Sequence, residues 1–406
     1  MKNRAAIAIF VLIFAAWLFP QAASADAAFD QFIQSLWPQA QRMGVSRATF
    51  DMATRGLEPD LSLPDLDIPG KRPPEQPEFV QSPADYVSER QIDRLAAHAR
   101  ELSAQYDATL KAIERQYGVP RNVLLAIWGR ETDFGRYKLP NSAIRVLATQ
   151  AYIGKRREKF REEFLLALKI LQEGHVKLSD MKSSWAGAMG LTQFLPSEFY
   201  KYAVDFDGDG KRDIWNSVPD ALAAAAGQLK AKGWQTGERW AYEVRAPQNV
   251  DCSIGVPEVR RPLKDWLAAG FVPAYGKKIS PRELSQEASL LQPEGIYGPA
   301  FLTLKNYYVI KEYNFSDLYV LFVGHLADKI SDPKPFEGAW AKIPLMKTKD
   351  VETMQKVLTE KGIYRDKIDG KAGMLTRAAL GQYQKQSGLK LDCWPTPEVL
   401  RHMQGR

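Results

Sequence analysis

The chain has 406 residues, of which 45% are hydrophobic and 11% aromatic, enough for one large core and a small additional domain. Its formal charge is +7, but the basic residues form no long run with interleaved aromatics, which argues against a nucleic-acid-binding protein. Only two cysteines occur, Cys252 and Cys393, and neither has a nearby second ligand that would indicate a metal site.

Residues 1–25 have the layout of a secretory signal peptide. Two basic residues precede an apolar run from Ala5 to Phe19, and small residues follow at 23–25. The run is short for a membrane span, and no cysteine stands near the cleavage site to carry a lipid anchor. We therefore expect an exported, periplasmic protein, at most peripheral to the membrane, that starts near Asp26 with a formal charge of +5. An uncleaved N-terminal anchor is the alternative.

Helical patterns dominate the rest of the chain. Apolar spacing and capping residues predict helices over residues 28–56, 82–117, 120–133, 157–173, 218–232 and 319–331. A proline-rich extended segment, residues 59–81, separates the first two, and short strands are expected at 240–244 and 301–304. The prolines of residues 332–335 predict a linker that couples a second part, from about residue 345, only loosely to the first. The two cysteines fall in different parts, so the sequence leaves open whether they pair.

Glu131 is a candidate general acid near the end of the helix predicted over residues 120–133. Val123, Ile127 and Glu131 are spaced four apart and therefore share one face. Burial against Ile127 and Trp128 would raise the pKa of the carboxyl, and the negative end of the helix dipole acts in the same direction. A glutamic acid that is protonated near neutrality suits glycosidic bond cleavage. A glutamate that only points to solvent is the alternative that spacing alone leaves open.

An acidic loop lies before the helix predicted over residues 218–232. Asp205, Asp207 and Asp209 occupy positions 1, 3 and 5 of an EF-hand-like loop, a glycine occupies position 6, and the carbonyl of Lys211 occupies position 7. Position 12 is Asn216 instead of the usual glutamate. The loop is therefore a candidate structural Ca²⁺ site, and an acidic turn without metal is the alternative.

Five segments, taken in order, resemble a known family. They are Arg130-Glu131-Thr132-Asp133-Phe134-Gly135, Lys155-Arg156-Arg157, the block from Ser184 to Ser197 with its Gly187-Ala188-Met189-Gly190-x-x-Gln193-Phe194-x-Pro196-Ser197 pattern, the acidic loop, and Tyr313-Asn314-Phe315-Ser316-Asp317-Leu318-Tyr319. The set resembles the membrane-bound lytic murein transglycosylase B family over roughly residues 28–335. The resemblance implies a mainly α, lysozyme-like transglycosylase domain, which we place at residues 26–335.

The same resemblance implies a reaction and a set of site residues. Glu131 would protonate the leaving oxygen of the β-1,4 bond between N-acetylmuramic acid and N-acetylglucosamine. It would then take the proton of the muramic C6 hydroxyl, which closes a 1,6-anhydro ring without water and without a catalytic cofactor. Asp220 would complete the calcium loop, and a capping box with Ser217 at the start of the next helix is the alternative role for Asp220. The residues implied to bind substrate are Ser184, Gln193, Tyr313, Asn314, Tyr319, Arg156 and Arg157.

Residues 348–403 carry a second pattern. Apolar spacing and an Asp369-Gly370-x-x-Gly373-x-x-Thr376 turn that leads into a helix resemble a small three-helix peptidoglycan-binding domain, which we place at residues 345–406. The segment 391–395 lacks the glycine that usually follows the aspartate there, which leaves the backbone of this last turn open. The resemblance implies that the glycan strands of peptidoglycan are the partner of the protein.

Two alternatives remain open from the sequence. A hydrolytic muramidase would use the same acid together with a base that activates water. Asp133 is poorly placed for that role, because two residues correspond to roughly 200° around a helix from Glu131. The second alternative is a catalytically silent protein that only binds the wall.

Overall fold

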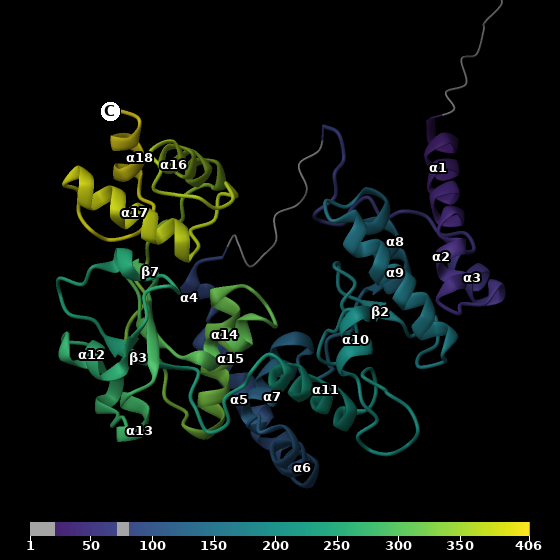
Figure 1. Ribbon diagram of the computed structural model, residues 1–406, viewed down its shortest axis with the longest axis horizontal. Helices are drawn as coiled ribbons and strands as arrows, with labels where there is room; N and C mark the ends of the chain where they lie inside the picture. Colours follow the sequence, from purple (N-terminus) through teal and green to yellow (C-terminus); the bar gives the residue numbers. More distant parts are fainter. Residues whose placement is uncertain (1–20, 71–80, 406) are drawn as a thin grey trace, which may run out of the picture.

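The computed structural model describes residues 21–70 and 81–405, and it is mainly helical, as the sequence predicts (Figure 1). The predicted signal peptide, residues 1–25, lies almost entirely outside the described residues. Within the described residues, no helix combines the length and the apolar character needed to cross a bilayer.

A central group of helices carries the candidate acid. It consists of α4 (Pro83–Tyr86), α5 (Glu89–Gln105), α6 (Asp107–Tyr117), α7 (Arg121–Thr132), α11 (Val218–Ala231) and α15 (Asp317–Ser331). The apolar faces form one continuous cluster, in which Leu124, Ile127 and Phe322 are fully buried. Because α7 packs against both α5 and α15, the helix that bears Glu131 is held on two sides.

The single helix predicted over residues 82–117 is wrong, because the chain forms three helices there. It leaves helical geometry at Val87 (φ −96°, ψ 49°) and bends again at Tyr106 (φ −104°, ψ 23°), where α5 ends and α6 begins. The Tyr106 ring packs edge-on against Trp128 of α7, with 6.2 Å between the ring centroids. The bend therefore lets α5 and α6 both contact α7.

The predicted helix over residues 28–56 is also three helices. They are α1 (Gln21–Ser35), α2 (Trp37–Arg42) and α3 (Arg47–Thr54). Gly44 has a left-handed φ of 84° after α2, and the Ser46 side chain caps α3 by accepting a hydrogen bond from the Thr49 amide. These two residues separate α2 from α3, whereas apolar periodicity alone predicts one continuous helix.

A second core lies to the right of the central helices in Figure 1. It contains α1–α3 together with α8 (Ala143–Ile153), α9 (Arg157–Gln172) and α10 (Pro196–Tyr202), and the short pair β1 (Asn141–Ser142) and β2 (Lys182–Ser183) is antiparallel. Helix α11 contributes Ala224 to this core and Leu222 to the central one. Tyr313 packs against both cores, so it lies where the two halves of the domain meet.

An antiparallel five-stranded sheet completes the first part of the chain. Its order is β4 (Arg261–Pro262), β6 (Glu287–Leu291), β8 (Ala300–Thr303), β3 (Ala241–Arg245) and β5 (Val272–Pro273). The strands predicted at 240–244 and 301–304 are confirmed as β3 and β8, which pair in the register Val244 to Ala300. Helices α12 (Leu263–Ala268) and α13 (Pro281–Leu284) and the 3₁₀ turn η3 (Ala274–Gly276) lie beside the sheet. In the sequence, β7 (Pro293–Ile296) precedes β8 and α14 (Lys305–Lys311) follows it.

The C-terminal part is a three-helix domain, as predicted. It consists of α16 (Thr348–Glu360), α17 (Met374–Ser387) and α18 (Pro397–Met403) around Met354, Leu358 and Leu380. The buried Gln355 side chain accepts hydrogen bonds from the Asp369 and Gly370 amides and donates to the hydroxyl of Thr376. This network fixes the turn that the sequence pattern identified.

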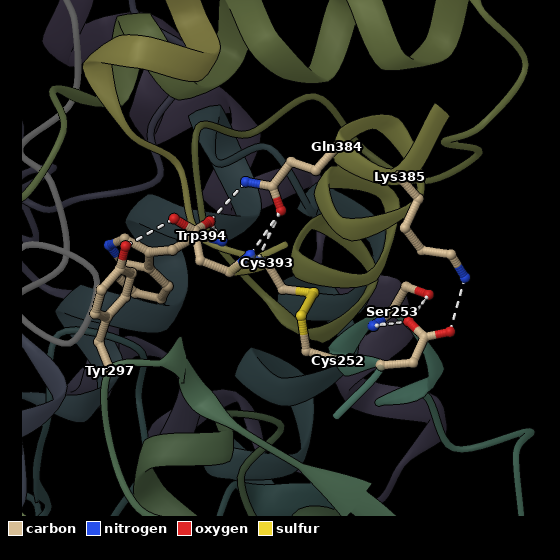
Figure 2. The surroundings of a disulfide bond; sticks show 9 residues. Cys252, Ser253, Tyr297, Gln384, Lys385, Cys393 and Trp394 are labelled. Carbon is tan, nitrogen blue, oxygen red and sulfur yellow. Dashed lines mark hydrogen bonds and ion pairs between the residues drawn. A yellow bond between two sulfur atoms is a disulfide. The ribbon is translucent and has the colours of Figure 1, made fainter. Parts of the chain in front are cut away.

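The expected loose coupling of this domain is wrong. Cys252 in η2 (Cys252–Ile254) and Cys393 form a disulfide across the junction, with 6.0 Å between their Cα atoms (Figure 2). Cys393 has a left-handed φ of 53°, so it adopts the conformation for which the family usually has glycine. The pairing that the sequence left open therefore joins the two domains covalently.

Polar contacts surround the disulfide. The hydroxyl of Tyr297 donates to Asp392 at 2.8 Å, Gln384 donates to the other oxygen of Asp392 at 2.6 Å, and Lys385 pairs with Asp251 at 2.7 Å (Figure 2). The segment that follows the linker is also held in place.

Phe336, just after residues 332–335, donates its amide to Glu89 at 3.2 Å, and its ring stacks on His325 at 3.7 Å between centroids. The proline pattern of the linker does not predict these contacts, because most of the residues that make them lie far from the linker in the sequence.

Candidate active site

Glu131 lies in the last turn of α7, as its spacing predicts. Pro120 precedes the helix, where its fixed φ and missing amide hydrogen suit a helix start. Directly after the helix, Asp133 (φ 49°), Phe134 (φ 58°) and Gly135 (φ 79°) turn the chain away in left-handed conformations. Helix α7 therefore ends just after the carboxyl, so the negative end of its dipole lies beside the acid.

Glu131 is only partly exposed to solvent. Burial raises its pKa to about 7, against the smaller lowering effects of a hydrogen bond from Tyr319 and of the Arg130 charge. The Tyr319 hydroxyl donates to Oε1 of Glu131 at 2.6 Å. Arg130 lies over the rings of Tyr86 and Phe322, at 4.6 and 4.7 Å from their centroids. Near neutral pH a substantial fraction of Glu131 therefore retains its proton.

Two tyrosines of the predicted set form one stacked unit beside the acid. The rings of Tyr313 and Tyr319 are nearly parallel, with an angle of 5° and 6.4 Å between centroids. Tyr319 is buried at the start of α15, and the Tyr313 hydroxyl donates to the carbonyl of Thr192 at 2.5 Å. The exposed Asn314 accepts the Ser316 amide at 3.1 Å and so shapes the turn between the two tyrosines. Asn314 is thus placed next to the pair.

Gln193 lies in a tight loop whose backbone requires special residues. Met189 and Phe194 exchange two backbone hydrogen bonds of 2.8 Å, and Gly190 (φ 73°) and Gln193 (φ 58°) both adopt left-handed conformations within the loop. A Cβ on Gly190 would come within 2.6 Å of the Ile214 carbonyl, so only glycine fits there. The Gln193 side chain donates to the Gly190 carbonyl at 3.0 Å. Its strained backbone is typical of a residue placed for function.

Ser184 organises the turn before this loop. Its Oγ accepts hydrogen bonds from the amides of Ala186 and Ala188, each at 3.3 Å. Among the described residues, neither Ser184 nor Gln193 hydrogen-bonds directly to Glu131. The structure therefore places both in loops that are fixed by their own backbones, and their expected contacts to a sugar stay a prediction.

Thr132 is a positioning residue that the sequence reasoning missed. Its hydroxyl donates to the Leu191 carbonyl at 2.8 Å and accepts the Gly135 amide at 3.2 Å. It therefore ties the end of α7 to the loop that carries Gln193. Its position directly after Glu131, as a buried hydroxyl in a short helix, is the signal that would have identified it.

A second carboxyl group that was not predicted, Glu198 of α10, adds negative potential at Glu131 and raises the pKa of the acid. Its own oxygens accept hydrogen bonds from the Leu195 amide at 3.1 Å and from Gln228 at 3.2 Å. Glu198 is thus held by two donors.

Arg156 and Arg157 lie at the start of α9 and form exposed ion pairs. Arg156 pairs with Asp65 at 2.9 Å and Arg157 with Asp67 at 3.2 Å. The Arg156 guanidinium also lies over the ring of Phe160. Their ion pairs in the described residues are therefore with the extended segment after α3, and a contact with substrate would have to compete with these exposed and weak interactions.

The acidic loop brings together the carboxylates of Asp205, Asp207 and Asp209. One oxygen from each lies within 4.8 Å of the others, and all three residues are exposed. Backbone amides of the loop donate to them, including Gly208 to Asp205 at 2.7 Å and Lys211 to Asp209 at 2.8 Å. These hydrogen bonds hold the three side chains on one side of the loop.

Asp220, in contrast, is completely buried at the start of α11. Its two oxygens accept the amides of Phe206 and Asp213, each at 2.8 Å, while Ser217 caps the helix by accepting the Asp220 amide. Burial raises the pKa of Asp220, although these amides lower it. Asp220 therefore closes the loop through backbone amides, and the structure shows no reciprocal bond of a capping box.

Comparisons with known proteins agree with this geometry. A family model described as a transglycosylase SLT domain matches residues 28–328, and one described as a putative peptidoglycan binding domain matches residues 347–403. The chain is 33% identical over 235 residues to the membrane-bound lytic murein transglycosylase B of Escherichia coli (strain K12). That match covers 56% of this chain and 61% of the relative, so the chain spans about three fifths of the length of that relative.

Two solved structures of SltB3 from Pseudomonas aeruginosa match over most of the chain. One is a complex with NAG-anhNAM-pentapeptide (38% identity, TM-score 0.84) and the other a complex with NAG-NAM-pentapeptide (39% identity, TM-score 0.83). The matches cover 93% and 92% of this chain and 99% of each SltB3 chain. With the family model covering most of its length, the chain belongs to the transglycosylase SLT domain family and carries a C-terminal peptidoglycan-binding domain.

Proposed function

We propose that this protein is a lytic transglycosylase that cleaves the β-1,4 bond between N-acetylmuramic acid and N-acetylglucosamine in peptidoglycan. The observation that carries the proposal is Glu131, a carboxyl group with a pKa of about 7 that is hydrogen-bonded to Tyr319 at 2.6 Å. Peptidoglycan strands are the substrate, and both SltB3 structures that resemble this chain hold muropeptides. The reaction leaves 1,6-anhydromuramic ends and needs no cofactor for catalysis.

Glu131 acts as acid and then as base. Because Oε1 accepts the Tyr319 hydroxyl, the proton of the carboxyl is free to sit on Oε2. In the first step this proton passes to the glycosidic oxygen as the bond to C1 of the muramic acid breaks. In the second step the carboxylate takes the proton of the C6 hydroxyl, and O6 bonds to C1. Glu131 ends the cycle protonated, so no water is consumed.

A hydrolytic alternative needs a second carboxylate that activates water. Asp133 is held by Arg94 at 3.0 Å and Arg136 at 2.9 Å, and both charges lower its pKa although burial raises it. Glu198 is occupied by two hydrogen-bond donors. Both of these carboxyl groups are therefore engaged by other partners, which favours ring closure.

The remaining predicted residues are proposed to bind the glycan. Tyr313 and Tyr319 offer a stacked aromatic surface, Asn314 shapes the turn between them, and Ser184 and Gln193 lie in loops that are fixed by their own hydrogen bonds. Arg156 and Arg157 are proposed to meet substrate carboxylates after exchanging their exposed partners Asp65 and Asp67.

The product ends provide the decisive experiment. Purified murein is digested with the protein, and the released muropeptides are analysed by mass spectrometry before and after borohydride reduction. We expect products with the mass of 1,6-anhydromuramic acid that borohydride does not reduce. Reducible muramic acid ends would identify a hydrolase, and an absence of released products would identify a silent wall-binding protein.

We also propose that the acidic loop holds a structural Ca²⁺ ion. Carboxylate oxygens of Asp205, Asp207 and Asp209 gather within 4.8 Å, and these donors with the Lys211 carbonyl match the hard oxygen ligands that Ca²⁺ prefers. Asp220 supports the loop by binding its amides. The ion would stiffen the connection between α10 and α11 and would take no part in the reaction.

Location and anchoring complete the proposal. Residues 1–25 are proposed to direct export to the periplasm, where the protein is at most peripheral to the membrane. Residues 26–335 would form the catalytic domain and residues 345–406 the domain that binds the wall, in line with matches at 28–328 and 347–403.

A further inference from the structure

Glu294 of β7 is a carboxyl group that is buried without a partner. Its side chain is 0% exposed, and neither of its two oxygens has a hydrogen-bond partner within residues 21–70 and 81–405. Buried carboxylates are normally paired with a cation or hydrogen-bonded, because a charge that has lost its water and has no partner is strongly unfavourable. The site therefore accommodates Glu294 far better in its protonated, neutral form.

The surroundings of Glu294 include an aromatic ring. The ring of Trp340 and the Cβ of Glu294 both lie beside Gly298, since a Cβ placed on Gly298 would come within 2.8 Å of the ring and 3.2 Å of the Cβ. Nε1 of Trp340 is also buried and has no partner in the part of the chain that the structure describes. Burial raises the pKa of Glu294 to about 7 and is the only cause of the shift. The carboxyl group therefore changes its charge near neutral pH.

The charged groups on the segments beside β7 have other partners. Asp392 of the C-terminal domain accepts hydrogen bonds from two side chains, and Lys390 donates to the hydroxyl of Tyr297 at 3.0 Å. Glu243 of β3 accepts two backbone amides of the segment that leads to residue 340. None of these groups shifts the pKa of Glu294, because burial alone accounts for it. No described cation therefore stands ready to neutralise Glu294 when it ionises.

The residues directly after Glu294 contact the C-terminal domain beside the disulfide (Figure 2). Gly295 has a left-handed φ of 58°, and a Cβ there would come within 2.1 Å of the Asp392 carbonyl, so only glycine permits this approach. The Ile296 amide donates to the same carbonyl at 3.2 Å, and the Tyr297 hydroxyl donates to the Asp392 carboxylate at 2.8 Å. Three consecutive residues thus contact one residue of the other domain.

We infer that Glu294 makes the attachment of the C-terminal domain to β7 sensitive to pH. While the carboxyl group is protonated, β7 stays packed and keeps its contacts with Asp392, which we call the closed state. The ionised carboxylate is stabilised by reaching water, which requires β7 to move and breaks these contacts, which we call the open state. The disulfide keeps the domain attached, so the junction loosens without dissociating. The inference concerns the conformation of the chain and does not depend on the proposed reaction.

The direction of the pH dependence follows from the two states. The pKa of Glu294 is about 7 in the closed state, and in the open state it returns to the ordinary value of 4.5. The closed state is therefore favoured most below pH 4.5, progressively less between pH 4.5 and pH 7, and least above pH 7. The difference between the two pKa values allows the opening equilibrium to shift by up to about 300-fold.

Amide hydrogen exchange of the full-length protein at pH 5 and pH 8 tests the inference. Protection is measured relative to an unstructured peptide at the same pH, so that the chemical effect of pH on exchange cancels. We expect residues 294–298, which include the Ile296 amide, to lose at least tenfold in protection between pH 5 and pH 8. Residues 354–358, in the core of the C-terminal domain, should keep their protection because that domain stays folded.

Two substitutions of Glu294 provide the comparison. Glu294→Gln has the same shape but does not titrate. Glu294→Leu replaces the unpartnered polar group with an apolar one of similar size, a change that is neutral or stabilising in a buried site. Both variants should protect residues 294–298 equally at the two pH values. Glu287→Gln is the matched control, because it removes the same charge from an exposed position of β6 and should keep the dependence of the wild type.

Equal protection of residues 294–298 at pH 5 and pH 8 in the wild type would overturn the inference. A pH dependence that persists in the Glu294 variants would also overturn it, since another group would then control the opening. So would a joint loss of protection at residues 294–298 and 354–358, because the domain itself would then unfold. Melting temperatures at pH 5 verify that the variants fold, and Glu294→Leu alone suffices for the comparison if Glu294→Gln does not.

Discussion

Glu131 and Asp317 are both carboxyl groups withdrawn from water at a helix end, but their environments act in opposite directions. Glu131 lies at the C-terminus of α7, where it has one hydroxyl partner and, among the described residues, no ion pair, and burial raises its pKa to about 7. Asp317 lies in the first turn of α15, and Lys311 and Arg377 hold its pKa below the usual range although burial alone would raise it. The helix dipole reinforces both differences.

The comparison shows that burial alone does not decide the role of a carboxyl group. With cations on both sides, Asp317 stays ionised and joins α14, α15 and the C-terminal domain as a structural element. Glu131 has only the weaker influence of the Arg130 charge, so burial decides, and it keeps a proton that it can transfer. The two groups are linked through α15. Tyr319 follows Asp317 in the first turns of this helix, and its hydroxyl donates to Glu131.

Removal of the acid is the strongest test of this difference. Glu131→Gln keeps the shape and the Tyr319 hydrogen bond but has no proton to donate to the glycosidic oxygen. We expect a loss of about 10²- to 10⁴-fold in turnover, as is typical of general acid–base catalysis, with unchanged pelleting on murein sacculi. Near-normal turnover in a variant that melts like the wild type would rule out Glu131 as the acid.

The role of the cations around Asp317 is tested by Arg377→Met. This change leaves the carboxylate of Asp317 buried with only Lys311 for neutralisation, so we expect the free energy of unfolding to fall by about 3 kcal/mol. Lys385→Met is the matched control, because it breaks an exposed ion pair with Asp251 at the same junction and should cost at most about 1 kcal/mol. If both variants lose the same free energy of unfolding in urea denaturation, burial of the ion pair makes no difference to its contribution.

Tyr319→Phe should make Glu131 less acidic still. The hydroxyl donates to the carboxylate and lowers its pKa, so its loss should raise the pKa above about 7 and move the alkaline limb of the pH–rate profile upward. The rate at the optimum should fall roughly thirtyfold, equivalent to about 2 kcal/mol for a hydrogen bond to an ionisable group. A limb that stays in place would mean that a different group controls it.

The raised pKa of Glu131 has a consequence for stability as well. The unfolded state ionises near 4.5 and the folded state near 7, so the folded state binds the proton more tightly. The unfavourable contribution of Glu131 is therefore absent below pH 4.5 and complete above pH 7. Glu131→Gln should remove this dependence, and comparison of the two unfolding curves between pH 4.5 and pH 7.5 measures it.

Local patterns in the sequence identified α7, the acid on its buried face and the three-helix domain, because these depend on residues close together in the chain. The breaks at Val87 and Tyr106 were missed, since apolar spacing continues through both. The junction was missed for a different reason. Its disulfide joins residues 141 positions apart, and the sequence of the linker between the domains does not predict that contact. Tyr319 was identified only through a family resemblance, because a tyrosine 188 positions from its carboxyl partner has no local signature.

The acidic loop adds a third environment to the comparison, in which carboxylates are not buried and form no ion pair within residues 21–70 and 81–405. Asp205, Asp207 and Asp209 are exposed, close together and hydrogen-bonded by backbone amides. A cation that binds only the folded loop should relieve the repulsion among them. At ten times its Kd, Ca²⁺ should stabilise the wild type by about 1.4 kcal/mol.

Calorimetric melting with and without Ca²⁺ tests this smallest effect. Asp205→Ala combined with Asp209→Ala should abolish the gain in melting temperature, because two of the three gathered carboxylates are lost. Glu101→Ala combined with Glu158→Ala removes two exposed carboxylates elsewhere and should keep the full gain, which separates a specific site from general screening of charge. If the loop variant and this control respond alike, the loop is an acidic turn whose carboxylates are satisfied by its own amides.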